Sequence, residues 1–327
     1  MRHTLNAMRI ETYYDIIGDI HGQYDKLKAL MARLGYKPAG KGFLPPEGRQ
    51  ALFLGDLIDP KPGHTQPGGV KAVLEVVKSM CDRGYAECIM GNHELNAIYF
   101  HSKGPDGQWL RVRGSKNIRM HQGTLDDFPD FEDPESEWQR IWLPWMKSLP
   151  FYFENNSVRA VHATWHPEMV DRVAMRNLSC PRFFLAASDK STPEGEALEV
   201  LLKGIEVDLP EGITFIDHTG AERRNMRARW WELPKPDISY DQLVFPANPD
   251  IPSVPVREEA FEQIPGYGLY EKPVFFGHYF KPINTGPEYD RCNVACLDYS
   301  AAKEGPLVAY RWEGESTILM EHYRMSS

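Results

Sequence analysis

The sequence lacks the features by which membrane and secreted proteins are recognised. Its apolar runs all fall short of the roughly 20 residues that a transmembrane helix needs. The N-terminus, MRHTLNAMRIETYY, contains no apolar signal-peptide region. The 5 cysteines are an odd number without the spacing of a disulfide framework, which indicates reduced thiols. We therefore expect a cytoplasmic protein without a membrane partner.

Positive charge is also scarce, with 37 Lys and Arg against 46 Asp and Glu and a formal net charge of −9. Because nucleic-acid backbones attract clusters of Lys and Arg, this balance argues against a general nucleic-acid binder. It does not argue against a small phosphate site, since bound metal ions can reverse the field locally. Nucleic acid is therefore disfavoured as a partner, whereas a phosphorylated substrate is compatible with the charge.

The 327 residues, 42% of them hydrophobic, have the composition of an ordinary globular protein. In the N-terminal part, predicted strands alternate with predicted helices in the order Tyr13–Ile17, Gln23–Leu34, Ala51–Leu54, Val70–Arg83 and Glu87–Met90. This order is typical of βαβ units and a mainly parallel sheet, so we expect an α/β fold. Further strands are predicted at Val158–Val161, Val274–Phe276 and Leu307–Tyr310.

The middle of the chain differs in character. Glu135–Leu149 is expected to form a helix that buries a stripe of Trp138, Trp142 and Trp145. Residues 167–270 are rich in proline and weakly periodic, which predicts a loop-rich insertion or cap between core segments 1–166 and 271–327. Within it, AERRNMRARWW (Ala221–Trp231) is either a solvated basic helix face packed by its tryptophans or a segment that contacts phosphate and a base.

Polar clusters follow the predicted strands. In chain order they are Gly18-Asp19-Ile20-His21-Gly22, Gly55-Asp56-Leu57-Ile58-Asp59, Gly91-Asn92-His93-Glu94, His162 and Gly277-His278. Because open α/β sheets build their sites at the carboxyl ends of strands, these clusters are expected to meet at one rim. One such cluster is usually a turn, whereas five in order favour a site. Carboxylate, imidazole and amide ligands suit two divalent ions better than a thiolate zinc site.

This ordered set of motifs resembles that of the calcineurin-like metallophosphoesterases. Within them it is similar to the phosphoprotein phosphatase branch, which includes Ser/Thr protein phosphatases and symmetrical diadenosine tetraphosphate hydrolases. The resemblance extends over residues 13–167 and 272–311, and it implies a βαβ sandwich with a dinuclear metal site at the strand ends. One motif departs from the pattern, because Ala163-Thr164-Trp165 follows His162 where the family usually has two glycines.

The resemblance also implies roles for individual residues. The implied metal ligands are Asp19 and His21 for the first ion, Asp56 as the bridge, and Asn92, His162 and His278 for the second ion. Water between two such ions has its pKa lowered from 15.7 towards roughly 7, which supplies hydroxide for attack on phosphorus. His93 would protonate the leaving oxygen while Asp59 holds its ring. Manganese is the expected metal, and iron or zinc also fits these ligands.

Two arginines that grip phosphate in this branch are absent, because Pro60 and Phe276 occupy their positions. A transferring phosphoryl group carries charge that two metals cover only in part, and the planar fork of arginine suits it. We expect the insertion to fold back over the strand ends and supply this cation. The candidates, in order of preference, are Arg227 and Arg229, then Arg223 and Arg224, then Lys61, Arg111 and Arg113.

Three functions are compatible with these residues. The favoured one is a metal-dependent phosphoester hydrolase that acts on phosphoproteins or small phosphorylated molecules. The alternative is a symmetrical dinucleoside polyphosphate hydrolase, since Gly277-His278-Tyr279 is similar to the Gly-His-Trp of those enzymes. The third is an inactive binding scaffold of the same fold. Such a scaffold should lack ligands, whereas none of the proposed ligand positions is missing here.

Overall fold

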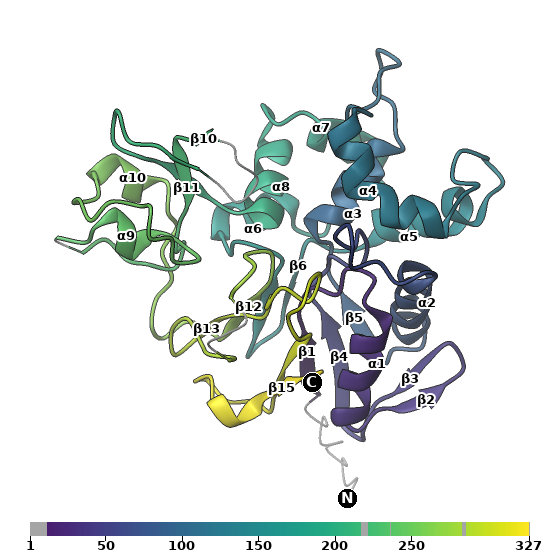
Figure 1. Ribbon diagram of the computed structural model, residues 1–327. Coiled ribbons are helices and arrows are strands. Elements are labelled where there is room, and N and C mark those ends of the chain that lie inside the picture. Colours follow the sequence, from purple (N-terminus) through teal and green to yellow (C-terminus); the bar gives the residue numbers. More distant parts are fainter. Residues whose placement is uncertain (1–11, 217–221, 236, 283–285, 327) are drawn as a thin grey trace, which may run out of the picture.

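Two β-sheets lie face to face at the centre of the computed structural model, which describes residues 12–216, 222–235, 237–282 and 286–326 (Figure 1). Residues 1–11, which make up most of the N-terminal segment MRHTLNAMRIETYY, lie outside the described residues. One sheet has the order β15 (Tyr323–Met325), β14 (Val308–Trp312), β1 (Tyr13–Ile17), β4 (Arg49–Phe53), β5 (Ala86–Cys88). The other has the order β13 (Val294–Cys296), β12 (Val274–Phe276), β7 (Arg159–Val161), β6 (Tyr152–Glu154).

The strands pair in both directions. β1, β4 and β5 run parallel, as the βαβ pattern predicts, whereas β14 and β15 pair antiparallel at the edge of β1. In the second sheet β12 runs parallel to β7 and β13, and β6 runs antiparallel to β7. Residues 155–158 alone connect β6 to β7, and a parallel pair needs a crossover of a dozen or more residues. The sandwich expected from the sequence is confirmed, but more of its strands pair antiparallel than expected.

Alternate residues of each strand enter two different cores. In β1, Tyr14 and Ile16 face the opposite sheet and pack in one cluster with Leu52, Phe275 and Tyr310. Ile17 belongs instead to the larger cluster formed with the helices. This alternation is the period of two that a strand imposes on its side chains. The carboxyl ends of β1, β4, β7 and β12 are thereby fixed by packing on both faces.

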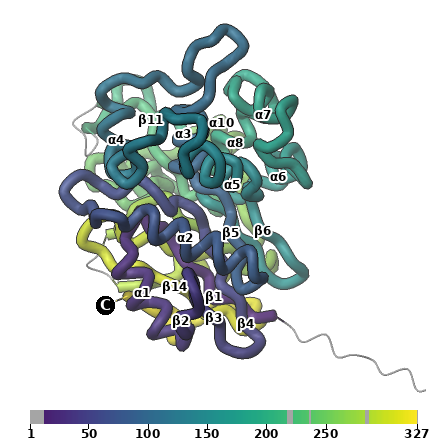
Figure 2. Tube along the Cα trace, turned by 90° about the vertical axis from the view of Figure 1, so that its right-hand side faces the viewer, coloured from purple at the N-terminus to yellow at the C-terminus, as the bar shows by residue number. Residues whose placement is uncertain are grey.

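Helices cover the outer face of the first sheet. α1 (Tyr24–Arg33) and α2 (Gly69–Asp82) connect its parallel strands, as predicted, and lie together on the right in Figure 1 and in front in Figure 2. α3 (Asn92–Phe100) starts directly behind β5, and α4 (Ser115–Asp127) follows a long loop. The sequence did not predict α4, which carries few apolar residues. A hairpin, β2 (Lys37–Ala39) and β3 (Gly42–Leu44), and a 3-10 turn, Met320–His322, complete the core.

The tryptophan-rich segment begins as a π-helix, Trp138–Trp142, and continues as α5 (Leu143–Ser148). Trp138 and Trp142 are buried and Trp145 is half-buried, so the predicted core role of the stripe is confirmed for the first two. A turn of π-helix contains more residues than a turn of α-helix. The tryptophans are therefore spaced around the helix axis differently from the regular helix that the sequence predicted.

Residues 167–203 are more helical than the sequence indicated. They form α6 (Pro167–Val173), α7 (Pro181–Ala187) and α8 (Pro193–Lys203). Each helix begins with a proline, which is favoured at the first helical position because its missing N–H has no partner there. The loop-rich character predicted for the whole insertion is therefore wrong for residues 167–203. The rest of the insertion holds β8 (Glu206–Asp208), β9 (Phe215–Ile216), β10 (Glu222–Arg223), β11 (Asn225–Arg227), α9 (Tyr240–Leu243) and α10 (Glu258–Glu262).

The basic stretch that starts at Ala221, itself outside the described residues, forms β10 and β11. Of the two alternatives for this stretch, the one with a basic helix is wrong about the helix, although Trp230 and Trp231 are packed as it expected. β11 pairs antiparallel with β8, which satisfies its backbone without helical turns. Trp230 and Trp231 are fully buried and pack edge-on against Phe276 or Phe245, so they cannot contact a base. They anchor the stretch to the second sheet, because burial of a large apolar side chain is favourable.

No helix among the described residues is long and apolar enough to cross a bilayer. All five cysteines are unpaired, with Cys88 and Cys296 buried and Cys180 exposed.

Candidate active site

The polar clusters predicted from the sequence do converge. Asp19 and His21 follow β1, Asp56 follows β4, His162 follows β7 and His278 follows β12, while Asn92 and His93 open α3. All of these side chains are buried, with exposed fractions of 9% or less. Burial of so many polar groups costs free energy unless each is paired or binds a ligand. Their partners therefore reveal what the site is built to hold.

Asp56 lies between two groups of histidines. One of its carboxylate oxygens is 3.6 Å from Nε2 of His21, and the other is 3.4 Å from Nε2 of His162. The candidate ligand atoms of Asp56, His21 and His93 lie within 4.8 Å of one another, and so do those of Asp56, His162 and His278. A carboxylate shared by two such groups has the position needed to bridge two cations.

Asn92 joins the second group through its amide oxygen. Nε2 of His162 lies 3.0 Å from that oxygen and Nδ1 of His278 lies 2.7 Å from it. The remaining ring nitrogen of His162 is 2.8 Å from the carbonyl of Leu54, and Nδ1 of His21 is 2.9 Å from the carbonyl of Ile58. Such carbonyl contacts fix the ring orientation and tautomer of histidines that ligate metals.

Three buried atoms of the cluster have no hydrogen-bond partner among the described residues: Oδ1 of Asp19, Nε2 of His21 and Nε2 of His278. An unsatisfied buried polar atom is costly, so three in one cluster indicate a missing ligand. Oxygen and imidazole nitrogen together form a donor set that suits divalent ions such as manganese, iron or zinc. The residues present therefore fit the metal ions that the resemblance implies.

Charge in the cluster is consistent with cation binding. Burial lowers the pKa of His21 to about 4, so its imidazole is neutral, as a metal ligand must be. Burial also lowers the pKa of His278 well below its usual value. Although burial disfavours the charged form of His162, Asp56 raises its pKa to about 10. A metal cation beside Asp56 would replace the proton on His162 as the positive charge that compensates the Asp56 carboxylate.

The backbone around the cluster is held in uncommon conformations. His21, Asp56, Asp59 and His278 have φ values of 50°, 49°, 61° and 71°. Non-glycine residues in this left-handed region cost of order 1–3 kcal/mol each, and such strain is concentrated at functional sites. Gly277 makes room for the cluster, because a Cβ there would lie 1.9 Å from Oδ1 of Asp19. The fold therefore spends stability on the placement of these side chains.

Glu94 organises the loop behind Asp56, a role that the sequence analysis did not assign. Its buried carboxylate accepts hydrogen bonds from the backbone N–H groups of Asp56, Leu57 and Gly91 at 2.8–2.9 Å. The carboxylate of Asp56 in turn accepts from the N–H of His93 at 2.8 Å. The signal for this role was the acidic residue at the third position of a helix, which is favoured at helix N-termini.

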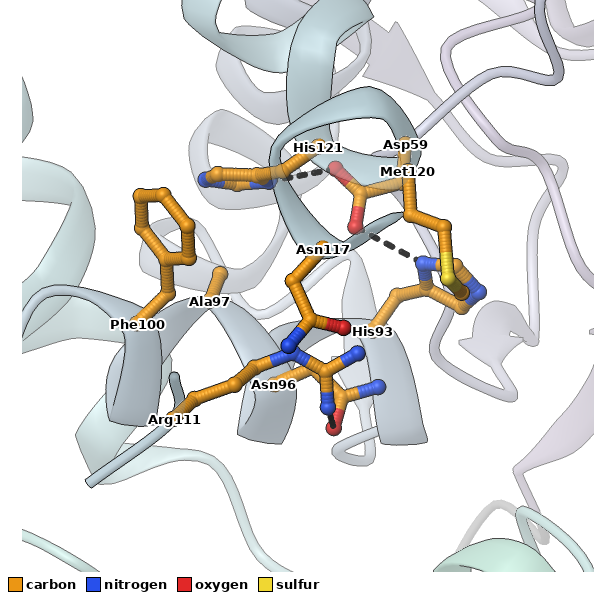
Figure 3. Close-up of a pocket in the computed structure, with 9 residues that line it drawn as sticks. All are labelled: Asp59, His93, Asn96, Ala97, Phe100, Arg111, Asn117, Met120 and His121. Carbon is orange, nitrogen blue, oxygen red and sulfur yellow. Dashed lines mark hydrogen bonds and ion pairs between the residues drawn. The ribbon is translucent and has the colours of Figure 1, made fainter. Parts of the chain in front are cut away.

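His93 is paired with Asp59, as the resemblance implies. Nδ1 of His93 lies 2.7 Å from one carboxylate oxygen of Asp59 (Figure 3). Burial alone would lower the pKa of His93, but Asp56 and Asp59 raise it above its usual value. The raised pKa favours the protonated ring that a general acid needs. Burial would raise the pKa of Asp59, but His121 and His93 hold it well below its usual value.

The other oxygen of Asp59 is held from α4, which the sequence analysis missed. Nδ1 of His121 lies 2.6 Å from it and the hydroxyl of Thr124 donates to it at 2.6 Å. Behind His121, the Nε2 atoms of His101 and His121 are 3.1 Å apart. The spacing His121 to Thr124 places both on one face of a helix, but no sequence signal tied that face to Asp59.

The arginines of the basic stretch do not act together. The guanidinium of Arg227 lies 5.6 Å from the ring centre of Tyr279. The pKa of His278 is lowered mainly by burial, and next by the positive charge of Arg227. Arg229 instead donates weakly to the carbonyl of Val244 and lines a surface cleft with Glu232 and Lys235. Arg223 and Arg224 are exposed. Of the preferred pair, the structure places Arg227 beside the cluster and Arg229 elsewhere.

Of the three weaker candidates for the cation, two lie near the cluster and one does not. The half-buried ammonium of Lys61 lies 5.0 Å from the ring centre of Phe280, which stacks on His21. Arg111 lines a small cavity together with His93 and Asp59. Arg113 is engaged elsewhere, because it donates to the carbonyl of Phe100 and to Glu132 and lies over Trp109.

Comparison with known proteins agrees with this geometry. The family model described as calcineurin-like phosphoesterase matches residues 14–187. An asymmetrical bis(5'-nucleosyl)-tetraphosphatase from Geobacillus sp. (strain WCH70) is 41% identical over 164 residues, which cover 48% of this chain and 60% of that protein. Matches to such asymmetrical relatives cover between 30% and 60% of their length.

Two further likenesses extend over nearly the whole chain. A symmetrical bis(5'-nucleosyl)-tetraphosphatase from Cronobacter sakazakii (strain ATCC BAA-894) is 24% identical over 314 residues, which cover 95% of each protein. The crystal structure of a cold-active protein-tyrosine phosphatase from a Shewanella species aligns with 97% of this chain and 80% of its own, with a TM-score of 0.47 and 15% identity.

Proposed function

Because this chain belongs to the calcineurin-like phosphoesterase family, we propose that it hydrolyses phosphoric esters or anhydrides at a site that holds two divalent metal ions. The observation that carries the proposal is the position of Asp56 between two groups of buried ligand atoms. The three unsatisfied atoms in the same cluster support it further. The proposed ligands are Asp19, His21, Asp56, Asn92, His162 and His278.

Divalent ions at this position would lower the pKa of a bound water and neutralise charge on the phosphoryl group. The water gives up one proton to solvent, and its oxygen bonds to phosphorus while the bond from phosphorus to the leaving oxygen breaks. His93 gives that leaving oxygen a proton, and Asp59 fixes the ring through Nδ1, which leaves Nε2 available to the substrate. His121 and Thr124 hold Asp59 in turn.

Arg227 is proposed as the cation that contacts the phosphoryl oxygens. It is half-buried beside His278, and no carboxylate lies within 4.0 Å of it among the described residues. Arg229 is directed towards Val244 and Arg223 lies on the exposed strand β10, so both are weaker candidates. Lys61, beside Phe280 and His21, is a second cation near the site.

Three further proposals complete the account. Segments 1–166 and 271–327 form the catalytic core, and residues 167–270 form an insertion that supplies Arg227. Manganese is the proposed metal, and iron or zinc also fits the same oxygen and imidazole ligands. The protein works in the cytoplasm, which is supported by five unpaired cysteines.

A second candidate narrows the substrate to symmetrical dinucleoside polyphosphates. Its support is the match to a symmetrical bis(5'-nucleosyl)-tetraphosphatase, which includes the insertion as well as the core because it covers 95% of both chains. Phosphoproteins are the other substrate class compatible with the site. An inactive scaffold is disfavoured, since all six ligand positions keep residues able to bind metal.

The test is hydrolysis of three substrates by the Mn²⁺-loaded protein: a phosphoserine peptide, diadenosine tetraphosphate and phenyl phosphate. The proposal expects turnover of at least one, and loss of that turnover when a chelator removes the metal. Faster turnover of diadenosine tetraphosphate would favour the second candidate. Failure to hydrolyse any of the three with Mn²⁺, Fe²⁺ or Zn²⁺ would contradict the proposed function.

A further inference from the structure

An arginine without an acidic partner lies beside the proposed proton donor. Arg111 is half-buried in the cavity that His93 and Asp59 also line (Figure 3). Its Nη1 donates to the amide oxygen of Asn96 at 2.7 Å, and no carboxylate lies within 4.0 Å of its guanidinium among the described residues. Asp59 and Glu199 act on Arg111 only from a longer distance. Desolvating a cation that has no counter-charge in direct contact is costly, so this position indicates an anionic ligand.

The position of Arg111 is fixed by the helix that carries His93. Asn96 follows His93 by three residues on α3, so the two side chains lie on the same face of the helix. The backbone N–H of Arg111 donates to the carbonyl of Tyr99 on that helix at 3.1 Å. In Figure 3 the guanidinium of Arg111 and the amide of Asn96 lie together beside the His93 side chain.

The cavity itself is too small for a substrate. Its volume is about 10 Å³, which is close to the smallest space that holds one water molecule. Its lining includes Asn117 and Met120 from α4 on the side opposite to α3. A ligand of Arg111 larger than water would therefore lie outside this cavity, against the lining that Arg111 shares with His93.

That place is where the leaving group has to be. His93 protonates the leaving oxygen in the proposed reaction, so the atoms attached to this oxygen extend past the His93 ring. We infer that Arg111 and Asn96 form a subsite for the leaving group, and that this leaving group is itself anionic. The inference rests on the proposed function, and it narrows the substrate to molecules in which phosphate follows the bond that breaks.

The inference separates the two substrate classes. When a phosphoprotein is hydrolysed, the leaving group is a serine or threonine side chain, which is neutral once protonated. When a polyphosphate is hydrolysed, the leaving group is a phosphate or nucleoside phosphate whose oxygens can accept two parallel hydrogen bonds from a guanidinium. The chain as a whole is acidic, so a half-buried cation at this point favours an anionic leaving group, and therefore the second class of substrate.

The test compares one variant on two substrates. Arg111→Ala is assayed with diadenosine tetraphosphate, whose leaving group is anionic, and with phenyl phosphate, whose protonated leaving group is neutral. We expect kcat/KM to fall roughly 10- to 150-fold on the first, the usual range for a hydrogen bond to a charged group. On the second it should stay within a few-fold of wild type. Arg111→Lys should recover part of the loss because it keeps the charge.

Arg113→Ala is the matched control, since it removes an arginine two residues away that is already bound to Phe100 and Glu132. It should not discriminate between the two substrates. An equal loss on both substrates in Arg111→Ala would place Arg111 at the reacting phosphoryl group or behind Asp59 and overturn the inference. An unchanged rate on diadenosine tetraphosphate would overturn it as well.

Binding distinguishes failure of the inference from failure of the proposed function. Calorimetry with a non-hydrolysable methylene analogue of diadenosine tetraphosphate, and separately with inorganic phosphate, needs no turnover. Arg111→Ala should weaken binding of the analogue and leave binding of phosphate unchanged. If the wild type hydrolyses nothing but this binding difference is observed, the proposed function fails, and Arg111 remains a residue that binds the anionic analogue. If the analogue binds both proteins equally, the subsite is wrong whatever the activity.

Discussion

The strand ends and the insertion both supply charged side chains, but they hold them differently. At the strand ends, Asp56 and the surrounding histidines are buried, contacted by backbone groups and placed by residues with positive φ. In the insertion the buried groups are apolar, above all Trp230 and Trp231, while Arg223 and Arg224 are exposed. The core therefore presents a preorganised charge cluster, and the insertion uses packing to place one arginine beside it.

This difference has an energetic reason. Buried carboxylates and imidazoles are tolerated when hydrogen bonds or a ligand compensate their desolvation, so each needs a fixed partner. An arginine at the surface has no such requirement, and loss of its contacts costs little stability. Substitutions of the proposed metal ligands should therefore affect metal binding and chemistry together, whereas substitutions in the insertion should leave metal content unchanged.

Asp56→Asn should have the largest effect. It removes the carboxylate charge between the two histidine groups, so activity on every substrate should be lost and metal content should fall. Elemental analysis and a rate assay after Mn²⁺ loading measure the two effects. Circular dichroism checks that the variant is folded. Full activity in folded Asp56→Asn would break the contrast between core and insertion.

His93→Asn should come next, with a loss of about 10²–10⁴ in kcat, the usual contribution of a positioned general acid. Metal content should be unchanged because His93 is the proton donor in this account. The loss should shrink for aryl phosphates with good leaving groups, since they need less protonation. A loss that is independent of the leaving group would argue that His93 acts as a ligand, as its place in the first histidine group would allow.

Arg227→Ala and Arg229→Ala form a matched pair within the insertion. If Arg227 contacts the phosphoryl group, its loss should cost roughly 2–4 kcal/mol of transition-state stabilisation, comparable to removal of an oxyanion donor. Arg229→Ala should stay within a few-fold of wild type because its guanidinium lies in a different surface cleft. Both comparisons use kcat/KM on one substrate. An Arg227→Ala variant that also stays within a few-fold of wild type would remove Arg227 from the site.

His121→Ala should have the smallest effect, a loss of about 10-fold in kcat on substrates with poor leaving groups. It removes one of two hydrogen bonds to the outer oxygen of Asp59, while Thr124 keeps the other. His121→Asn should recover activity, since its amide can donate from nearly the same place as Nδ1. A different result would be an alanine variant that unfolds at a lower temperature while its loss in kcat is the same for good and poor leaving groups. That result would mean that His121 has a structural role alone.

The sequence indicated which polar residues would lie together because these residues follow the ends of strands. Asp56 and His278 follow short apolar runs, and the chain direction of parallel strands brings such residues to one rim. Arg227 was among the preferred candidates, but its separation from Arg229 depends on the pairing of β11 with β8, which no local pattern shows. His121 was missed because its helix is mostly polar and packs on Asp59 through a long loop.

The central claim is that the cluster around Asp56 binds two divalent ions, and metal stoichiometry tests it most directly. Wild-type protein is stripped with a chelator, reloaded with Mn²⁺, freed of excess metal and measured by elemental analysis against protein concentration. The account predicts close to two Mn²⁺ per chain in the wild type, unchanged in Arg229→Ala. Folded wild-type protein that retains no Mn²⁺, Fe²⁺ or Zn²⁺ would contradict it.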